Sequence, residues 1–221
     1  MFLIFGLSDS GSLHAWGACG GSSILPSPTK MSKRLFVAIP TEQGLTQLLT
    51  QHAVLSGEFP WLKPESPEYF HSTVLFLGEV KDELVPEIED ALTDIAAIQH
   101  QFNLQVEKIM YAPEAQRPSM IWALFVRSKQ FTNLVSQVKE ELYYILGDTD
   151  SKEVIPHITL ARFNKNEPIP KVLPNLTQME GGVGSMPVTK MILMQSKLPT
   201  AHKSASGPTY HVLSEFLFNI H

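Results

Sequence analysis

The sequence has a single cysteine, no long apolar segment and no excess of basic residues. Cys19 cannot form an intramolecular disulfide, and no group of thiols suggests a structural zinc, so we expect a reducing, cytoplasmic location. The longest apolar runs are strand-sized, far below the roughly 20 residues of a membrane helix, and we expect no membrane association. The net charge of −5 excludes a global basic field for long nucleic acid. A nucleic-acid substrate would therefore be held locally, at an end or as a small fragment.

Residues 1–30 differ from the rest of the chain. They are rich in Gly, Ser and Pro and show no sustained hydrophobic period, and the first basic residue is Lys30, so the positively charged region of a secretory signal is missing. We expect 1–30 to be a flexible extension outside the fold. The chain is 43% apolar and 18% charged, which is ordinary for one substantial core. We expect 31–221 to form a single domain and the protein to be a monomer.

From Met31 onward, apolar residues follow strand-like or helical spacing in a clear order. Asp82 is a candidate helix N-cap, and Gly147 is placed to end a helix. Residues 168–179 are expected to form a short helical or turn segment. Helices are expected over 41–55, 81–98 and 128–147, and strands over 34–40, 70–78, 102–110, 119–126, 156–163, 188–198 and 209–218.

Two of these strands carry the same short motif, HSTV from His71 and HITL from His157. The second histidine lies 86 positions after the first (157 − 71), and the same shift relates Phe36 to Trp122 (122 − 36) in another pair of expected strands. One tetrapeptide carries little weight, but several elements related by one offset indicate a duplicated unit. If the two copies pack about a pseudo-twofold axis, the histidines face each other across one cleft. Two matched packing histidines remain an alternative, although half-buried imidazole is a poor choice for packing alone.

Alternation along a strand places His71 and Thr73 on one face, as it does His157 and Thr159. Two imidazoles on opposite walls can act as acid and base in the in-line hydrolysis of a phosphodiester, because one can be neutral and the other protonated near neutral pH. The threonine hydroxyls would hold the non-bridging oxygens.

The motifs do not suggest a metal or a serine nucleophile. Each strand offers one good ligand and no neighbouring carboxylate, so we expect no metal and no other cofactor. Ser72 lies beside His71, but alternation directs its side chain to the opposite face.

The motifs and their surroundings resemble a known family. Two HxTx motifs in duplicated strands are similar to those of the two-histidine phosphoesterase superfamily. RLFVAIP, FPWLKPE, HSTVLFLGEV, RPSMIWALF, IPHITLAR and GPTYHVL resemble the bacterial RNA 2′,3′-cyclic phosphodiesterases, also known as LigT-type 2′-5′ RNA ligases, over Ser32 to His221.

This resemblance implies an α+β, bilobal fold in which two mostly antiparallel sheets flank a central cleft, with helices outside. It implies metal-independent hydrolysis of RNA 2′,3′-cyclic phosphate ends, or of small nucleotides that carry one, to 2′-phosphates, with reversible 2′-5′ ligation. His71 would be the proton donor and His157 the proton acceptor, while Thr73 and Thr159 would bind the phosphate. Three alternatives remain open: a related enzyme for a small cyclic nucleotide, a non-catalytic module that binds RNA ends or nucleotides, and a structural or partner-binding protein with a duplicated core.

Arg162 is a further candidate for substrate binding. The resemblance suggests a basic residue after the second motif, yet strict alternation from His157 directs Arg162 to the opposite face. Only a bulge, a strand end or a strong twist would return its side chain to the cleft, and a surface charge is the alternative. Lys203 is interpreted as a solvated loop lysine that could also steer a phosphate.

Overall fold

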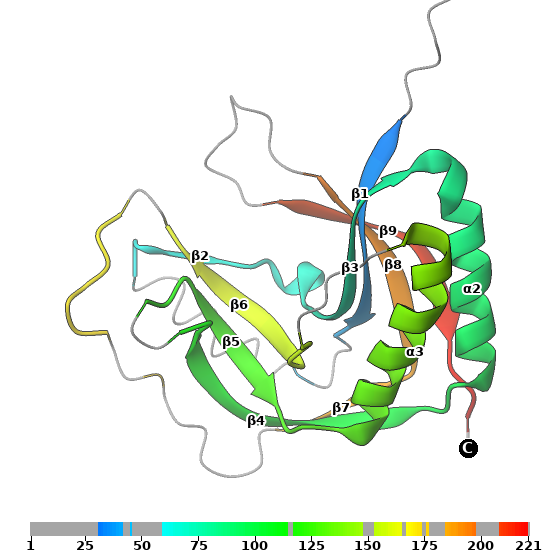
Figure 1. Ribbon diagram of the computed structural model, residues 1–221. Helices are drawn as coiled ribbons and strands as arrows, with labels where there is room; N and C mark the ends of the chain where they lie inside the picture. Colours follow the sequence, from blue (N-terminus) through cyan, green and yellow to red (C-terminus); the bar gives the residue numbers. More distant parts are fainter. Residues whose placement is uncertain are drawn as a thin grey trace, which may run out of the picture.

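The computed structural model describes residues 31–41, 45, 59–114, 117–147, 153–164, 167–173, 176, 184–197 and 208–220. This part of the chain has an α+β fold of antiparallel strands with helices against one side (Figure 1). The helices are α2 (Val85–Ile98) and α3 (Lys129–Leu146), with short 3-10 turns η2 (Pro67–Tyr69) and η3 (Asp82–Leu84). The strands are β1 (Ser32–Pro40), β2 (Leu62–Pro64), β3 (His71–Lys81), β4 (Phe102–Ala112), β5 (Met120–Phe125), β6 (His157–Phe163), β7 (Ser185–Val188), β8 (Lys190–Lys197) and β9 (Thr209–Leu217).

The strands form one path in the order β7-β4-β5-β6-β3-β1-β8-β9, with β2 paired to β6. A shift of 86 residues carries β3 onto β6, β1 onto β5 and β4 onto β8. Counted outward from the centre of the path, β3, β1 and β8 therefore correspond in order to β6, β5 and β4. The two sheets expected from the family resemblance are therefore the two halves of this path. They meet where Ser72 of β3 pairs with Ile158 of β6.

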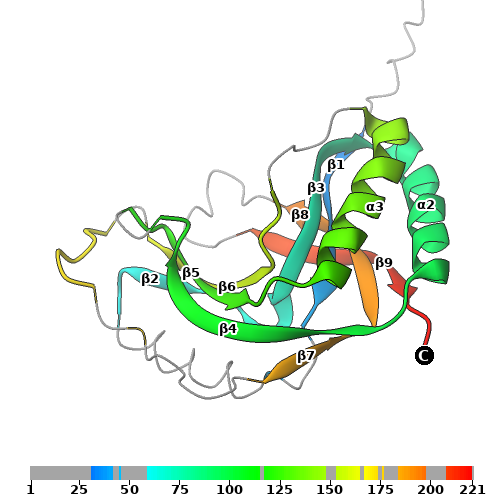
Figure 2. The same cartoon turned by 60° about the horizontal axis from the view of Figure 1, so that its bottom comes forward.

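Both described helices cover the same half of the molecule. α2 and α3 lie side by side against β3, β8 and β9 (Figures 1 and 2). The backbone N–H of Phe131 donates to the Ser128 hydroxyl at the start of α3, and Gly147 ends the helix with a φ of 76°. Of the expected helix over 41–55, only Thr41 and Leu45 lie within the described residues, and Leu45 is buried. Of the described helices, none is long and apolar enough to cross a bilayer.

Three details of the sequence prediction were wrong. Asp82 does not cap α2, since it begins η3 and its carboxylate pairs with Lys33 at 3.0 Å. The expected strand over 188–198 corresponds to β8 except that its first residue, Val188, ends β7, which pairs with β4 while β8 pairs with β1 and β9. β2 was missed because it has only three residues.

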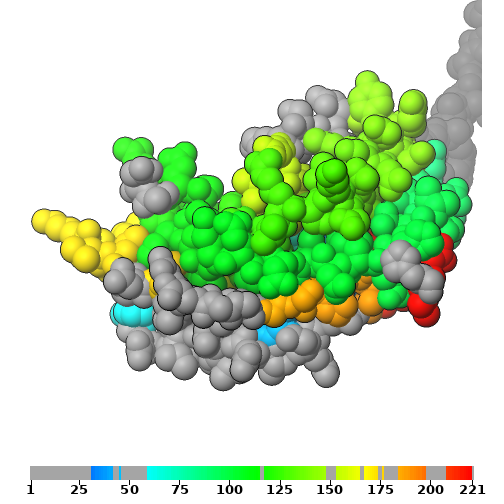
Figure 3. All heavy atoms as spheres, turned by 90° about the horizontal axis from the view of Figure 1, so that it is seen from below, coloured from blue at the N-terminus to red at the C-terminus, as the bar shows by residue number. Residues whose placement is uncertain are grey.

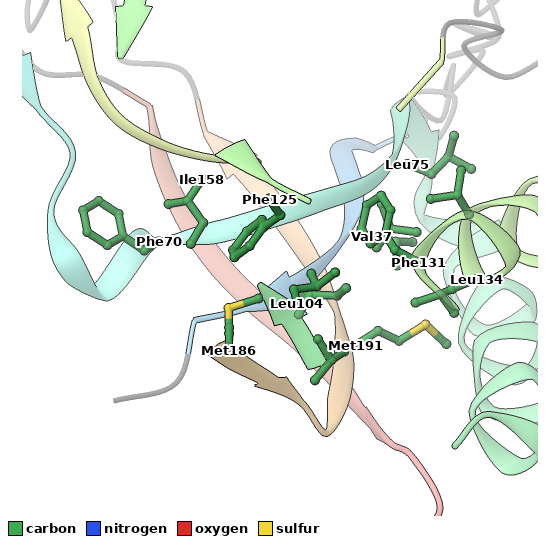
Figure 4. Close-up of a cluster of buried hydrophobic side chains, with 14 of the residues drawn as sticks. Val37, Phe70, Leu75, Leu104, Phe125, Phe131, Leu134, Ile158, Met186 and Met191 are labelled. Atoms are coloured by element: carbon green, nitrogen blue, oxygen red, sulfur yellow. The ribbon is translucent and has the colours of Figure 1, made fainter. Parts of the chain in front are cut away.

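The core lies between the helices and one face of the sheet. Figure 4 shows Val37 and Leu75 close to Phe131 and Leu134 of α3, with Ile158 and Phe125 further along the same layer. Seen from below, β4 and β7 run together along the base of the molecule (Figure 3). A smaller apolar cluster of Phe36, Ala38, Ile192 and Met194 lies on the opposite face of β1 and β8. This second face borders the site described next.

Candidate active site

The two histidines begin the two central strands. In β3 and β6, Ser72 pairs with Ile158 in antiparallel register, so His71 lies opposite Thr159 and Thr73 lies opposite His157. The side chains of Ser72 and Ile158 point to one face of the sheet, so those of the four neighbouring residues point to the other. For regular antiparallel strands, this arrangement places the two histidines at diagonal positions with Cβ atoms about 7–8 Å apart.

Each imidazole is held by the same backbone contact. Nδ1 of His71 donates to the carbonyl oxygen of Tyr69 at 2.6 Å, and Nδ1 of His157 donates to that of Ile155 at 2.7 Å. A carbonyl oxygen only accepts, so in both rings Nδ1 carries a proton. Nε2 is therefore the nitrogen left to exchange a proton with a ligand. The two carbonyl residues are themselves 86 positions apart (155 − 69).

An aromatic ring packs against each imidazole. Trp122 stacks on His157 with ring centroids 3.7 Å apart, and Phe36 lies against His71 with centroids 5.0 Å apart. Phe36 and Trp122 are the residues related by the 86-residue offset, so the same packing is present in both halves. Tyr210 of β9 adds an edge contact to His71, with centroids 5.3 Å apart. These contacts restrict the rotation of both rings and remove water from them.

The surroundings favour the neutral form of both histidines. Burial lowers the pKa of His71 below 6.5, the hydrogen bond to Tyr69 opposes this shift, and the positive charge of Arg162 lowers the pKa further. Burial likewise lowers the pKa of His157, with further lowering from the charges of His71 and Arg162. The charge of His71 therefore disfavours a second positive charge on His157.

Thr73 and Thr159 both line the cleft that contains the histidines. Within the described residues, neither hydroxyl has a hydrogen-bond partner, so both are available to a ligand. Ser72 lies on the opposite face, as alternation predicts, and is 0% exposed. Its hydroxyl finds no partner in the described part of the chain, and it does not reach the histidines' side of the sheet.

Arg162 is brought into the cleft by a β-bulge. Trp122 pairs with Thr159 but Ile121 pairs with Ala161, so Leu160 is an extra residue in β6. Leu160 and Ala161 are both buried, the alternation is broken, and Arg162 returns to the face of Thr159. β3 has a bulge at the equivalent place, where Val74 is left unpaired.

The guanidinium of Arg162 is fixed from several sides. Its Nε donates to the carboxylate of Glu65, and Nη1 lies 3.4 Å from the sulfur of Met120. The Glu65 side chain is 13% exposed and that of Arg162 is 39% exposed, so the pair is half-buried with the arginine toward solvent. Burial raises the pKa of Tyr210, and Arg162 opposes that shift through its charge and a hydrogen bond.

The assembled cleft has a volume of about 500 Å³. It contains both histidines, both threonines and Arg162, together with Arg34 and Tyr210, which sequence reasoning did not single out. Lys203 lies outside the described residues. Across the described ranges, His, Cys, Asp and Glu side chains form no group of three or more that could hold a metal ion.

Comparison with known proteins shows a consistent similarity. The family model described as LigT like Phosphoesterase matches residues 37–122, which include the first motif. An Archaeoglobus fulgidus protein named RNA 2′,3′-cyclic phosphodiesterase is 28% identical over 187 residues, covering 83% of this chain and 99% of its own. The chain is similar to the LigT-like phosphoesterases.

Further similar proteins and solved structures agree with this comparison. A Thermus thermophilus protein named RNA 2′,3′-cyclic phosphodiesterase is 28% identical and covers 83% of this chain and 89% of its own. The crystal structure of TT0787 of Thermus thermophilus matches with a TM-score of 0.70 at 27% identity, covering 84% and 97% of the two chains. E. coli LigT, solved in complex with 3′-AMP, matches with a TM-score of 0.64 at 20% identity, covering 85% and 99%. At that identity, the likeness to E. coli LigT concerns the fold alone.

Some residues of the site could have been found from the sequence and others could not. Phe36 and Trp122 share the offset of the histidines, which was a usable signal for their common role as ring supports. Glu65 and Tyr210 had no such signal, because their contacts with Arg162 arise only when distant segments meet.

Proposed function

We propose that the protein hydrolyses RNA 2′,3′-cyclic phosphodiester ends to 2′-phosphomonoesters, with His71 as the acid and His157 as the base. The main support is that the two imidazoles lie at diagonal positions in one cleft, each held by a hydrogen bond from Nδ1 to a backbone carbonyl oxygen. Relatives named RNA 2′,3′-cyclic phosphodiesterase support the substrate class. The alternative is a module that binds RNA ends or nucleotides without catalysis.

His157 activates the attacking water. Its pKa is lowered by burial, so the ring is neutral near pH 7 and Nε2 can accept a proton. As the water oxygen bonds to phosphorus, its proton passes to Nε2. The hydrogen bond from Nδ1 to Ile155 then stabilises the imidazolium that forms.

His71 protonates the leaving oxygen. The P–O3′ bond breaks opposite the attacking oxygen, and O3′ takes the proton from Nε2 of His71, which leaves a free 3′-hydroxyl and a 2′-phosphate. Burial and Arg162 oppose the charged form of His71 in the free protein. A bound phosphate anion has the opposite effect and raises this pKa, so substrate binding favours the acid.

Thr73, Thr159 and Arg162 hold the non-bridging oxygens. The hydroxyls are uncommitted among the described residues, and the bulge directs the guanidinium to the same face. Hydrogen bonds to developing negative charge are among the largest catalytic contributions that a site can make. The scheme requires no metal ion or cofactor. Because a 5′-hydroxyl can replace water as the attacking group, the same steps give reversible 2′-5′ ligation.

The test is hydrolysis of adenosine 2′,3′-cyclic phosphate in EDTA by the wild type, His71→Ala and His157→Ala. We expect a 2′-phosphate product and losses of roughly 10²- to 10⁴-fold in each variant. His211→Ala removes an exposed histidine of β9 and serves as the control. Cyclic phosphate that binds without turnover would favour the non-catalytic module, and turnover unchanged by either substitution would refute the acid–base pair.

A further inference from the structure

A second, smaller cavity adjoins the catalytic cleft. This recess has a volume of about 190 Å³, and its walls include Phe76, Trp122, Val154, Ile155 and His157. It shares Thr73, Phe76, Trp122 and His157 with the main cleft. His157 lines both the recess and the main cleft. In the described part of the chain, His71 lines the main cleft but not the recess. The recess therefore lies on the His157 side of the site.

The two halves of the molecule differ in chemistry at Phe76, which lines the recess. Phe76 follows the bulge of β3 as Arg162 follows that of β6, and the two positions are 86 apart (162 − 76). One half thus presents a cation and the other an aromatic ring. Phe76 is 52% exposed although it packs against Phe36 with centroids 5.6 Å apart. A large exposed aromatic side chain in a cleft is typical of a ligand contact.

We propose that this recess binds the nucleobase of a second nucleoside, whose 5′-oxygen lies on the His157 side of the phosphorus. The inference rests on the proposed function, in which His157 takes the proton from the attacking oxygen. Whatever that oxygen carries must lie beside His157. Water carries nothing further, but an RNA 5′-hydroxyl carries a ribose and a base, and Phe76 and Trp122 provide aromatic surfaces on which a base stacks.

The bonding changes balance without any other reactant. O5′ bonds to phosphorus and its proton passes to Nε2 of His157, while the P–O3′ bond breaks and O3′ receives a proton from His71. The product is a 2′-5′ diester with a free 3′-hydroxyl. Glu153 also lines the recess and can accept a hydrogen bond from an exocyclic amino group, which makes adenine a suitable probe.

The experiment compares two stable ligands. 3′-Deoxyadenylyl-(2′→5′)-adenosine lacks the 3′-hydroxyl needed for cleavage, and the methyl ester of 3′-deoxyadenosine 2′-phosphate has the same charge but no second nucleoside. Titration calorimetry should show the dinucleotide binding about 5- to 100-fold more tightly to the wild type. Phe76→Leu should abolish this difference, and Phe76→Tyr should retain it. Tyr144→Leu, which removes an 85% exposed aromatic residue from α3, should retain it as well.

The outcomes separate this inference from the proposed function. If adenosine 2′,3′-cyclic phosphate is hydrolysed but the wild type binds both ligands equally, the second subsite is wrong and the phosphodiesterase stands. A binding difference that persists in a folded Phe76→Leu variant would also overturn the subsite. If the cyclic phosphate is not hydrolysed and neither ligand binds, the proposed function fails, and the subsite fails with it.

Discussion

Replacing Thr73 and Thr159 by valine tests whether their hydroxyls hold the phosphate. Valine has nearly the shape of threonine but lacks the hydroxyl. Within the described residues, neither hydroxyl bonds to another group, so the change leaves no protein donor or acceptor without a partner. The free energy of unfolding should therefore change by less than about 1 kcal/mol, and Tm by no more than a few degrees.

The catalytic cost should be much larger than the cost in stability. A hydrogen bond to a charged group contributes about 1.5–3 kcal/mol, which corresponds to roughly 10- to 150-fold in kcat/KM for each hydroxyl. Thr73 lies opposite His157 and Thr159 lies opposite His71, so a phosphate bound between the histidines would have one hydroxyl on each side. If they bind different oxygens, their free energies add, and the double variant should lose roughly 10²- to 10⁴-fold.

The assay is the initial rate of adenosine 2′,3′-cyclic phosphate hydrolysis, with thermal unfolding measured on the same samples. Thr73→Ser and Thr159→Ser keep the hydroxyl and should recover most of the activity. Ser72→Ala removes a hydroxyl from the buried face of β3 and should leave kcat/KM unchanged. Valine variants with wild-type kcat/KM would refute the reasoning, as would a loss that serine does not restore.

Three further predictions follow from the histidine environment and the core. Burial and the charge of Arg162 lower the pKa of His71, so the protonated acid becomes scarce as the pH rises through and above neutrality. On this alkaline limb kcat/KM should fall about tenfold per pH unit. Arg162→Met should lower kcat/KM about 10- to 100-fold and move that alkaline limb to higher pH, since the arginine's charge lowers the pKa of both histidines. Phe131→Ala should reduce the free energy of unfolding by about 3–5 kcal/mol in urea titrations, because this ring is 1% exposed in the core.

Each of these predictions has a contradicting result. A rate that is constant from pH 6 to pH 9 would show that no histidine acts as the acid. An alkaline limb that does not move in Arg162→Met would mean that the arginine charge does not reach the imidazoles. Phe131→Ala should retain its kcat/KM per folded molecule, and a selective loss of activity at full stability would contradict a purely structural role.

The features that repeat between the two halves could be predicted from the sequence alone. One offset related the histidine motifs, the strand pattern and the pair Phe36 and Trp122, and alternation placed each threonine on the face of its histidine. Strand alternation is a local property of the backbone, so it could be applied before any packing was known. The same reasoning correctly directed Ser72 to the buried face.

Tertiary structure decided what local pattern could not. Arg162 reaches the cleft because pairing with β5 leaves Leu160 as an extra residue, and a bulge depends on the partner strand rather than on the sequence of β6. Glu65 and Tyr210 meet Arg162 from segments far apart in the chain. The lowered histidine pKa values likewise require burial and Arg162 together. The sequence thus determined which candidate groups share one face, whereas the meeting of β3 and β6 set their spacing, their charge and the space beside them.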